Sequence, residues 1–453
     1  MSRVLIVSHD VVDRRMAGPA IRAWEFARRL SRENQVTLAI PNETTLTGQG
    51  FALLPYDRQS LRELAAAADC AVVSGLTLMQ YPFLRHLCPV LVMDIYDPFV
   101  LENLQLFADR DMALRLRDHH DLTRAMNDQL LLGDFFLCAS EEQRNYWLGA
   151  LSALNRVNPR TYDLDPTLRA LIDVAPFGLP DAPPVHRRSV IKGVVPGIGP
   201  DDTVLLWNGG IYNWLDPLTL IRAVARVAAS RDEVRLFFMG IKHPNPRVHP
   251  MRMVGDATRL SDALGLTGRH VFFNDWVAYE DRENYLLEAD LGVSLHLPHI
   301  ETHFAFRTRL LDCLWAGLPV VVTGGDTLAR LVEAHDLGRV VEPEDVDGVA
   351  AAILDLLAGP DPRATRAEAF DRVRRQFTWQ RAIEPLARFC VDPRPAPDRA
   401  GGGAPAEAVG SPHLGASSSW RVLLAKAWLC LRHRGPRALW REVRGYVDWR
   451  WGR

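Results

Sequence analysis

The stretch VLIVSHDVVDRRMAGPAIRAWEFARRLSRENQVTLAI, residues 4–40, joins a short apolar run to an amphipathic segment and then to a second apolar run. Its apolar runs are short and uniformly apolar, which is typical of strands covered on both faces, and AIRAWEFARRL repeats apolar residues at helical spacing. Strand, helix and strand in this order indicate a parallel sheet with helices on both sides. The stretch therefore predicts a doubly wound α/β domain.

The same alternation continues to about residue 180 and then starts again. The later strand candidates are CAVVSG, PVLVMDIYD and FFLCAS in the first part, and TVLLWNGG, VRLFFMG, HVFFNDW, LGVSLHL and LPVVVTGG in the second. The Pro- and Gly-rich passage PFGLPDAPPVHRR separates the two parts as a linker would. Since 453 residues exceed what one hydrophobic core usually supports, we predict two Rossmann-like domains, residues 1–180 and 181–391, that face each other across a cleft.

The carboxyl-terminal part of the sequence has a different character. Residues 392–419 are rich in Pro, Gly, Ala and Ser, and this composition predicts a disordered linker. Residues 420–453 combine tryptophans with an excess of arginine, which predicts short amphipathic helices. Because tryptophan favours the membrane interface and arginine favours anionic lipids, we expect this tail to bind the inner face of a membrane; packing against a partner protein is the alternative.

The overall composition narrows the classes of function. The net charge of −2 gives no reason to expect a nucleic-acid partner. The six cysteines form no CxxC pair and no cluster at metal-ligand spacing, so neither a metal nor another cofactor is expected. The chain opens directly into a strand pattern, and no apolar run is long enough to span a bilayer, so we expect a cytoplasmic protein that is peripherally attached to the membrane.

Several candidate binding residues follow predicted strands, where open α/β sheets bind their ligands. Gly18 precedes the first helix, and Gly209 and Gly210 follow the strand TVLLWN, where a missing Cβ would let a diphosphate approach the backbone. Lys242 comes directly after VRLFFMG and suits a phosphate oxygen. Ordinary turns remain the alternative for the glycines, and a solvated surface side chain is the alternative for the lysine.

The stretch LGVSLHLPHIETHFAFRTRLLDCLWAGLPVVVTGGD, residues 291–326, holds the densest set of candidates. Glu301 precedes a loop that contains Arg307 and Arg309, and Asp312 follows on the next predicted helix. A carboxylate here could accept hydrogen bonds from ribose or sugar hydroxyls, and a guanidinium group could hold two phosphate oxygens. A solvated helix face is the alternative, but these charges stand among large apolar residues, which favours a binding role.

With these motifs in their order along the chain, the sequence resembles the retaining nucleotide-sugar glycosyltransferases of family 4, also called glycosyl transferases group 1, which have the GT-B fold. The similarity covers roughly residues 3–390. Its anchors are VLIVSH with the Gly18 loop, ASEEQ after FFLC, PFGL at residues 176–179, the two glycines after LLWN, and DCLWAGLPVVVT. The resemblance implies transfer of a sugar from a nucleotide-sugar donor, with retention at the anomeric carbon and no need for a metal.

The resemblance also implies roles for particular residues. Asp312 stands where the family has the second of two glutamates, and Glu301 is the substitute for the first if the loop between them is three residues longer. The family's Arg and Lys after the first strand of the second domain are absent here. The negative diphosphate still needs neutralising, so we expect Lys242, Arg307 and Arg309 to replace them.

Near the reacting centre the family often carries a histidine from the first domain. Asp97 stands closest to that position, and His9 at the end of the first strand is a second candidate. A turn-capping role is the alternative for Asp97, and packing is the alternative for His9. Base contacts are expected around Asn274, Asp275 and Trp276.

Two other functions share these features. A nucleotide-sugar epimerase also has two Rossmann-like domains, and a catalytically inactive GT-B protein could act as a scaffold. A membrane-bound tail favours a glycosyltransferase whose acceptor is a glycan or a lipid-linked glycan made for the cell surface. The sequence thus predicts polysaccharide biosynthesis by a hexosyltransferase-like enzyme.

Overall fold

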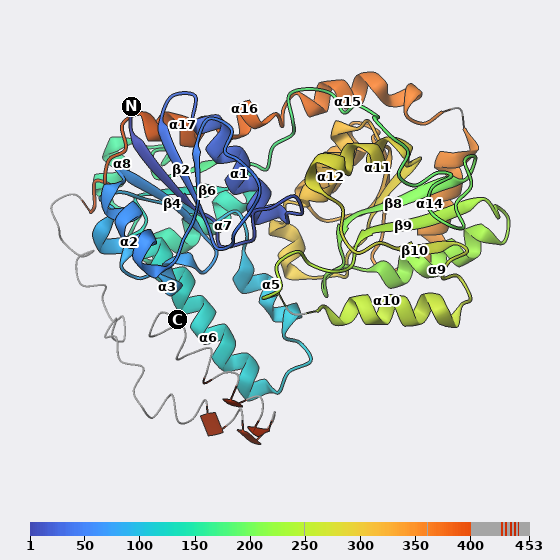
Figure 1. The fold of residues 1–453 in the computed structure, drawn as a ribbon, viewed down its shortest axis with the longest axis horizontal. Coiled ribbons are helices and arrows are strands. Elements are labelled where there is room, and N and C mark those ends of the chain that lie inside the picture. Colours follow the sequence, from blue (N-terminus) through green and yellow to red (C-terminus); the bar gives the residue numbers. More distant parts are fainter. Residues whose placement is uncertain are drawn as a thin grey trace.

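The structure is a computed structural model. It describes residues 1–248, 250–359 and 361–399, together with Ala427, Trp428, Leu431, Arg432, Gly435, Pro436, Leu439, Trp440 and Val443. These residues form two α/β domains that lie side by side (Figure 1). Most of the predicted linker and most of the predicted helical tail lie outside the described residues.

The first domain is built on a parallel sheet of seven described strands in the order β3-β2-β1-β4-β5-β6-β7. Its strands are β1 (Arg3–Val7), β2 (Gln35–Ile40), β3 (Ala52–Pro55), β4 (Cys70–Ser74), β5 (Leu91–Asp94), β6 (Phe135–Cys138) and β7 (Ile172–Val174). Its helices are α1 (Gly18–Leu30), α2 (Arg58–Ala67), α3 (Thr77–Gln80), α4 (Leu84–Leu87), α5 (Phe99–Leu106), α6 (Met112–Leu132), α7 (Glu141–Ala153) and α8 (Pro159–Leu164).

The second domain repeats this plan with six described parallel strands in the order β10-β9-β8-β11-β12-β13. The strands are β8 (Thr203–Gly210), β9 (Val234–Gly240), β10 (Val271–Phe273), β11 (Leu291–Ser294), β12 (Val320–Thr323) and β13 (Gly338–Val341). The helices and 3-10 turns are α9 (Pro217–Ala228), α10 (Arg252–Ala263), η1 (Tyr279–Asp281), α11 (Arg282–Glu288), η2 (Ile300–Phe304), α12 (Thr308–Trp315), α13 (Thr327–Ala334), α14 (Val346–Ala358), η3 (Ala364–Arg366), α15 (Ala367–Arg374), α16 (Trp379–Ala382) and α17 (Glu384–Val391).

The central strands are buried on both faces, as their uniformly apolar sequences predict. Every residue of β5, β6, β11 and β12 is buried between the covering helices. In both sheets the first strand lies beside the fourth, so the strand order reverses there and opens a crevice at the carboxyl ends of the strands. The predicted fold class, two Rossmann-like doubly wound domains facing each other across a cleft, is confirmed.

The end of the second domain crosses back onto the first. Figure 1 shows α15, α16 and α17 leading from one domain to the other. Trp379 of α16 is fully buried, with its ring edge-on to Phe26 of α1, and Phe389 of α17 stacks on Phe135 of β6 at 4.5 Å between ring centroids. A Cβ on Gly178 would lie 2.4 Å from the Trp379 ring, so only glycine fits at this crossing.

The predicted disordered linker, residues 392–419, needs a correction at its start. Ala396 is buried, and the carboxylate of Asp398 accepts a 2.7 Å hydrogen bond from Nε of the fully buried Arg156. Arg399 pairs with the buried Asp134 at 2.9 Å. A composition poor in aliphatic residues gave no sign that this segment packs on a core. The ion pairs of Arg156 with Asp398 and of Asp134 with Arg399 hold residues 392–399 on the first domain.

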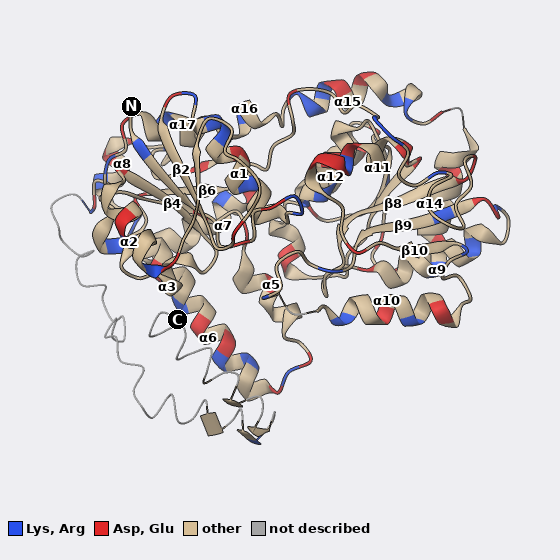
Figure 2. Ribbon diagram, in the orientation of Figure 1, with Lys and Arg blue, Asp and Glu red and all other residues tan. Residues whose placement is uncertain are grey.

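Acidic and basic residues alternate along the exposed helices α6 and α10 (Figure 2), in keeping with the small net charge. Among the helices of the described residues, none has both the length and the apolar character that crossing a bilayer would require.

Candidate functional site

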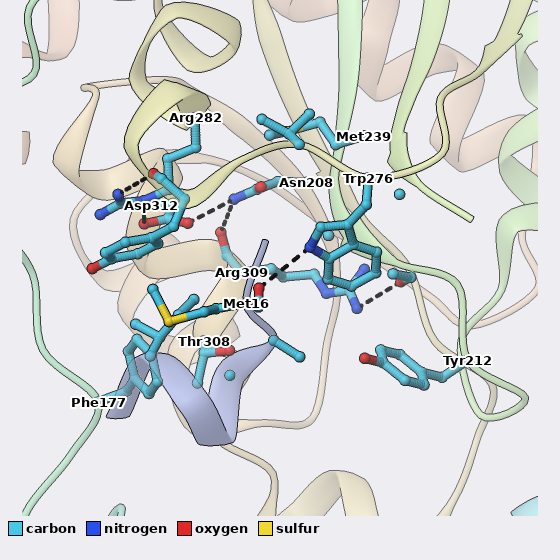
Figure 3. Close-up of a pocket in the computed structure, with 18 residues that line it drawn as sticks. Met16, Phe177, Asn208, Tyr212, Met239, Trp276, Arg282, Thr308, Arg309 and Asp312 are labelled. Carbon is cyan, nitrogen blue, oxygen red and sulfur yellow. Dashed lines mark hydrogen bonds and ion pairs between the residues drawn. The ribbon is translucent and has the colours of Figure 1, made fainter. Parts of the chain in front are cut away.

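A pocket, here called the cleft pocket, lies between the two domains at the carboxyl ends of their strands (Figure 3). The loop between β1 and α1 forms one wall, and the ends of β8 and β9, the β10–α11 connection and the start of α12 form the other. The pocket is lined by Met16, Ala17, Gly18, Ile21, Phe177, Asn208, Gly209, Gly210, Tyr212, Met239, Gly240, Trp276, Val277, Tyr279, Arg282, Thr308, Arg309 and Asp312. The structure thus brings together six of the predicted donor-binding residues: Gly18, Gly209, Gly210, Trp276, Arg309 and Asp312.

The two glycines that end β8 give the pocket a bare backbone wall. Gly209 has φ +98°, a conformation that side chains other than glycine's rarely adopt. The register between β8 and β9 is irregular between Trp207 and Gly210, which is where the strand turns into the pocket. A ligand can therefore approach the main chain here without meeting a Cβ.

Two helix amino ends also border the pocket. Gly18 opens α1 and Thr308 opens α12, and both residues line the pocket. Neither cap residue, Ala17 or Arg307, makes a side-chain cap hydrogen bond. The first amide groups of both helices lack side-chain partners, and the positive ends of both helix dipoles favour an anion in the pocket.

Arg309 supplies a full positive charge to the same wall. Its Nη2 donates to the carbonyl oxygen of Gly210 at 3.0 Å, whereas its buried Nη1 has no hydrogen-bond partner. Among the described residues no carboxylate lies within ion-pair distance, and burial lowers the pKa of Arg309 to about 10. A buried guanidinium that lacks an anion is costly unless a ligand provides one. The wall around Arg309 is therefore suited to an anion.

Asp312 forms the polar centre of the opposite end of the pocket. Its Oδ1 accepts a 3.2 Å hydrogen bond from Nε of Arg282, and its Oδ2 accepts a 3.4 Å hydrogen bond from Nδ2 of Asn208 (Figure 3). The Arg282 guanidinium also lies 3.8 Å from the ring centroid of Tyr279. Asp312 is thereby held in one orientation while it stays open to the pocket.

Sequence reasoning missed Asn208 and Arg282. Asn208 immediately precedes the two glycines, so its position near the carboxyl end of a strand was a usable signal. For Arg282 the sequence offered no such signal, because its side chain reaches Asp312 from a different helix, thirty positions earlier in the chain.

Lys242, predicted to bind the diphosphate, lies outside the cleft pocket. Its Nζ pairs with Asp275 at 2.8 Å on an exposed surface, and it lines a neighbouring pocket. Trp276 lines both pockets and separates them, with its Nε1 donating to the carbonyl oxygen of Met16 at 3.3 Å. Gly240 makes this possible, because a Cβ there would lie 2.6 Å from the Trp276 ring.

Glu301 and Arg307, predicted as a catalytic and a donor-binding residue, pair with each other instead of lining the cleft pocket. Nη2 of Arg307 donates to Oε2 of Glu301 at 2.6 Å, and Asp326 lies 3.8 Å from its Nε. All three side chains are buried. The prediction that Arg307 replaces the family's phosphate-binding cations needs correction, because Glu301 already neutralises it.

The predicted catalytic residues His9 and Asp97 line a separate small pocket in the first domain. Nδ1 of His9 lies 3.1 Å from the hydroxyl of Ser74, and burial lowers the pKa of the imidazole. Burial raises the pKa of Asp97 to about 6, and the nearby Glu301 carboxylate acts in the same direction. These residues lie beside the cleft pocket rather than in its wall.

Two Rossmann-like domains that face each other across a cleft make up the GT-B fold, and the comparisons agree with this class. Residues 202–359 match the family described as glycosyl transferases group 1. The chain therefore has the GT-B fold, and its second domain is similar to the group 1 glycosyltransferases.

Individual proteins resemble this chain in sequence or in fold. Over 126 residues the chain is 30% identical to a phosphatidyl-myo-inositol mannosyltransferase of Mycolicibacterium smegmatis, and the match spans 28% of this chain and only 31% of that relative. The fold is similar to sucrose-phosphate synthase from Thermosynechococcus elongatus, with a TM-score of 0.58 at 15% identity over 86% of this chain and 98% of that one. It is also similar to Anabaena HepE in complex with UDP-glucose, with a TM-score of 0.59 at 15% identity over 86% of this chain and all of that one.

Proposed function

We propose that this protein is a retaining glycosyltransferase that binds a nucleotide-sugar donor in the cleft pocket. The observation that carries the proposal is Arg309, whose buried Nη1 has no partner and which pairs with no carboxylate among the described residues, set beside the bare backbone of Gly209 and Gly210. A diphosphate supplies the charge that this wall lacks. HepE, a structural neighbour, binds UDP-glucose, which supports a donor of this chemical class.

In this proposal the chain's main task is electrostatic. As the bond between the anomeric carbon and the diphosphate breaks, negative charge grows on the leaving group. Arg309 and the amino ends of α1 and α12 stabilise that charge. The neutralising charge thus comes from the chain itself and not from a metal ion. Asp312 is placed to accept hydrogen bonds from the ribose, and Asp97 from a sugar hydroxyl.

Donor binding is the direct test. Thermal unfolding should be followed with UDP-glucose, GDP-mannose and other nucleotide sugars, because a ligand that binds the folded state raises the unfolding temperature. Calorimetry on the chain and on Arg309→Met then gives the contribution of the guanidinium. If every nucleotide sugar left the unfolding temperature of the native chain unchanged, the proposal would be wrong.

The reaction separates the three candidate functions. A glycosyltransferase releases the nucleoside diphosphate and joins the sugar to an acceptor or to water, whereas an epimerase changes the sugar while it stays on the nucleotide. A scaffold does neither. Nuclear magnetic resonance of the product's anomeric proton reports whether the configuration is retained.

The acceptor in this proposal is a lipid-linked or cell-surface glycan, reached through attachment of the tail to the inner face of the membrane. The arginines and tryptophans of residues 420–453 support it, as does the mannosyltransferase relative, whose name specifies a phosphatidylinositol acceptor. Sedimentation with vesicles of anionic phospholipid should be lost when residues 420–453 are removed. Vesicle binding that survived this truncation would contradict the membrane role of the tail.

A further inference from the structure

An arginine and a carboxylate form an ion pair within the cleft pocket. Arg282 opens α11 and Asp312 lies in α12, and both residues line the pocket. Nε of Arg282 donates to Oδ1 of Asp312 at 3.2 Å (Figure 3). The Arg282 side chain is 12% exposed and the Asp312 side chain is 26% exposed. The carboxylate is therefore the member of the pair that a ligand reaches more easily.

The Arg282 guanidinium is fixed by contacts that do not involve Asp312. Its Nη1 donates to the carbonyl oxygen of Tyr279 at 2.7 Å, and its central carbon lies 3.8 Å from the Tyr279 ring centroid and 4.8 Å from that of Trp315. Cations lie favourably over aromatic faces, so both rings hold the group in place. Tyr279 is tied to the first domain, since its amide donates to the carbonyl oxygen of Arg14 at 2.8 Å. A guanidinium held in this way can set the orientation of the carboxylate.

Asp312 keeps half of its hydrogen-bonding capacity for a ligand. A carboxylate has about four acceptor positions, two on each oxygen. Arg282 takes one position on Oδ1, and Nδ2 of Asn208 takes one on Oδ2 at 3.4 Å. Within the described part of the chain, one position on each oxygen stays open. Two open positions on one carboxylate suit two neighbouring hydroxyl groups, such as those at C2′ and C3′ of a ribose.

The spacing along α12 fits a nucleotide. Arg309 and Asp312 both line the pocket and are three positions apart, so their Cβ atoms lie roughly 5–6 Å apart on one face of the helix. A diphosphate bound at Arg309 places the ribose of the same nucleotide beside Asp312. The Asp312 charge alone would repel this anionic ligand, and the paired Arg282 offsets that charge.

We propose that Arg282 is a positioning residue for the donor, which holds the Asp312 carboxylate so that it accepts both ribose hydroxyls. The site is thereby selective for ribonucleotides over deoxyribonucleotides. This inference rests on the proposed function. Without the guanidinium, the Asp312 side chain can turn to other rotamers, and only Asn208 holds it. A site built to bind a hydroxyl discriminates against a ligand that lacks it, and this discrimination is lost when the acceptor is no longer held in place.

Calorimetry on the full chain with UDP, GDP, ADP and CDP, each compared with its 2′-deoxy form, tests this role. The nucleotide that binds the native chain best should bind at least about tenfold more tightly than its 2′-deoxy form. In Arg282→Met this ratio of affinities should fall to about twofold or less, because the carboxylate is no longer oriented. Asp312→Ala gives the ratio without the carboxylate, and adding Arg282→Met to it should change the ratio no further.

Arg282→Lys separates charge from orientation. It keeps a cation beside Asp312 but loses the planar group that reaches Asp312 and the Tyr279 carbonyl together, so it disturbs the fold less than Arg282→Met does. The ratio of affinities should fall in this variant too. A native ratio in Arg282→Lys would mean that charge alone is sufficient, and it would contradict the positioning role.

Arg363 provides the matched control, because it joins the same two helices from outside the cleft pocket. Its Nη2 donates to the carbonyl oxygens of Leu286 and Ala289, in and directly after α11, both at 2.6 Å. Its Nη1 donates to that of Ala316, directly after α12, at 2.9 Å. Arg363→Met should lower the unfolding temperature and leave the ratio of affinities unchanged. A ratio that fell equally in Arg363→Met and Arg282→Met would indicate general loosening and would overturn the inference.

The binding data also separate this inference from the proposed function. If Arg282→Met weakens the ribose and deoxyribose forms by the same factor, or changes neither, Arg282 has no positioning role. If the native chain binds both forms equally, Asp312 does not hold the ribose and the inference fails, whereas donor binding stands. If none of the nucleoside diphosphates and none of the nucleotide sugars binds the native chain, the proposed function itself is wrong.

Discussion

Arg309 illustrates, at the scale of one residue, how a side chain suited to ligand binding can lower the stability of the free protein. Its buried Nη1 has no partner, and no carboxylate in the described part of the chain pairs with it, so this charge is uncompensated there. We expect Arg309→Met, which keeps the apolar stem, to raise the free energy of unfolding by about 1 kcal/mol. The same change should weaken donor binding by about 2–3 kcal/mol, since hydrogen bonds to a charged group are lost. Urea unfolding and calorimetry measure the two effects.

Arg307 is the matched control, two positions away and paired with the buried Glu301. Arg307→Met leaves that carboxylate without its partner and should cost about 3–5 kcal/mol of stability. Changes of opposite sign in the free energy of unfolding would distinguish the ligand-binding arginine, Arg309, from the structural one, Arg307. If Arg309→Met destabilised the free chain as much as Arg307→Met does, Arg309 would be structural too.

Asp97 gives a prediction about pH. Its pKa in the folded chain, about 6, lies above its ordinary value of 3.8. The stability gained from the protonated form is fully present below pH 3.8 and is lost as the pH rises through 6. Asp97→Asn, which resembles the protonated form, should therefore raise the free energy of unfolding by about 2 kcal/mol at pH 8 and change it little at pH 4. Equal effects at both pH values in urea unfolding would rule out this titration.

Residue identity alone could not separate the two arginines. The pattern in residues 291–326 predicted a loop with Arg307 and Arg309 and a following helix with Asp312. In the structure Arg307 precedes α12, and Arg309 and Asp312 both lie on it. Which guanidinium faces the pocket depends on Glu301, which folds back from η2 to pair with Arg307. That choice is made by tertiary packing, which no local pattern contains.

At the scale of elements, the amino end of α1 lends itself to a test of anion binding. A Cβ at Gly18 would meet no atom within 4 Å, so a side chain fits. Gly18→Asp adds a negative charge at the positive end of the helix, which should stabilise the free chain by about 0.3–1 kcal/mol. The same charge should weaken binding of the diphosphate donor at least about tenfold through repulsion. The neutral Gly18→Asn, nearly equal in size, should bind the donor at least several times more tightly than Gly18→Asp.

The strands show which elements a sequence predicts well. The buried central strands, such as β1, β5 and β8, coincide with uniformly apolar runs. The strands that the sequence pattern did not indicate, β3, β7 and β13, all lie at sheet edges, where three or four residues pair on one side only. β3 and β13 are partly exposed and need less apolar character, and β7 has only three residues, so periodicity does not mark them.

At the scale of the whole molecule, the domains touch directly across the cleft. Nδ2 of Asn245, in the loop after β9, donates to Oδ1 of Asp10 in the first domain at 2.7 Å, and both side chains are buried. Asn245→Ala leaves the Asp10 carboxylate with one fewer donor and should weaken the domain contact by about 1.5–3 kcal/mol. We expect small-angle X-ray scattering to show a larger radius of gyration for this variant. Added donor should reduce it, because a ligand that contacts both walls of the cleft favours the closed state.

The exposed ion pair between Arg252 and Asp109 is the control, since it also joins the two domains, at 2.6 Å. Both side chains are more than half exposed, so water and salt screen the attraction and Arg252→Ala should change the contact by less than about 1 kcal/mol. Scattering from this variant should match that of the native chain. If Asn245→Ala also scattered like the native chain, this hydrogen bond would not hold the cleft closed, and closure would depend on the other contacts between the domains, such as those of Trp276 with Met16 and of Gln143 with Phe304.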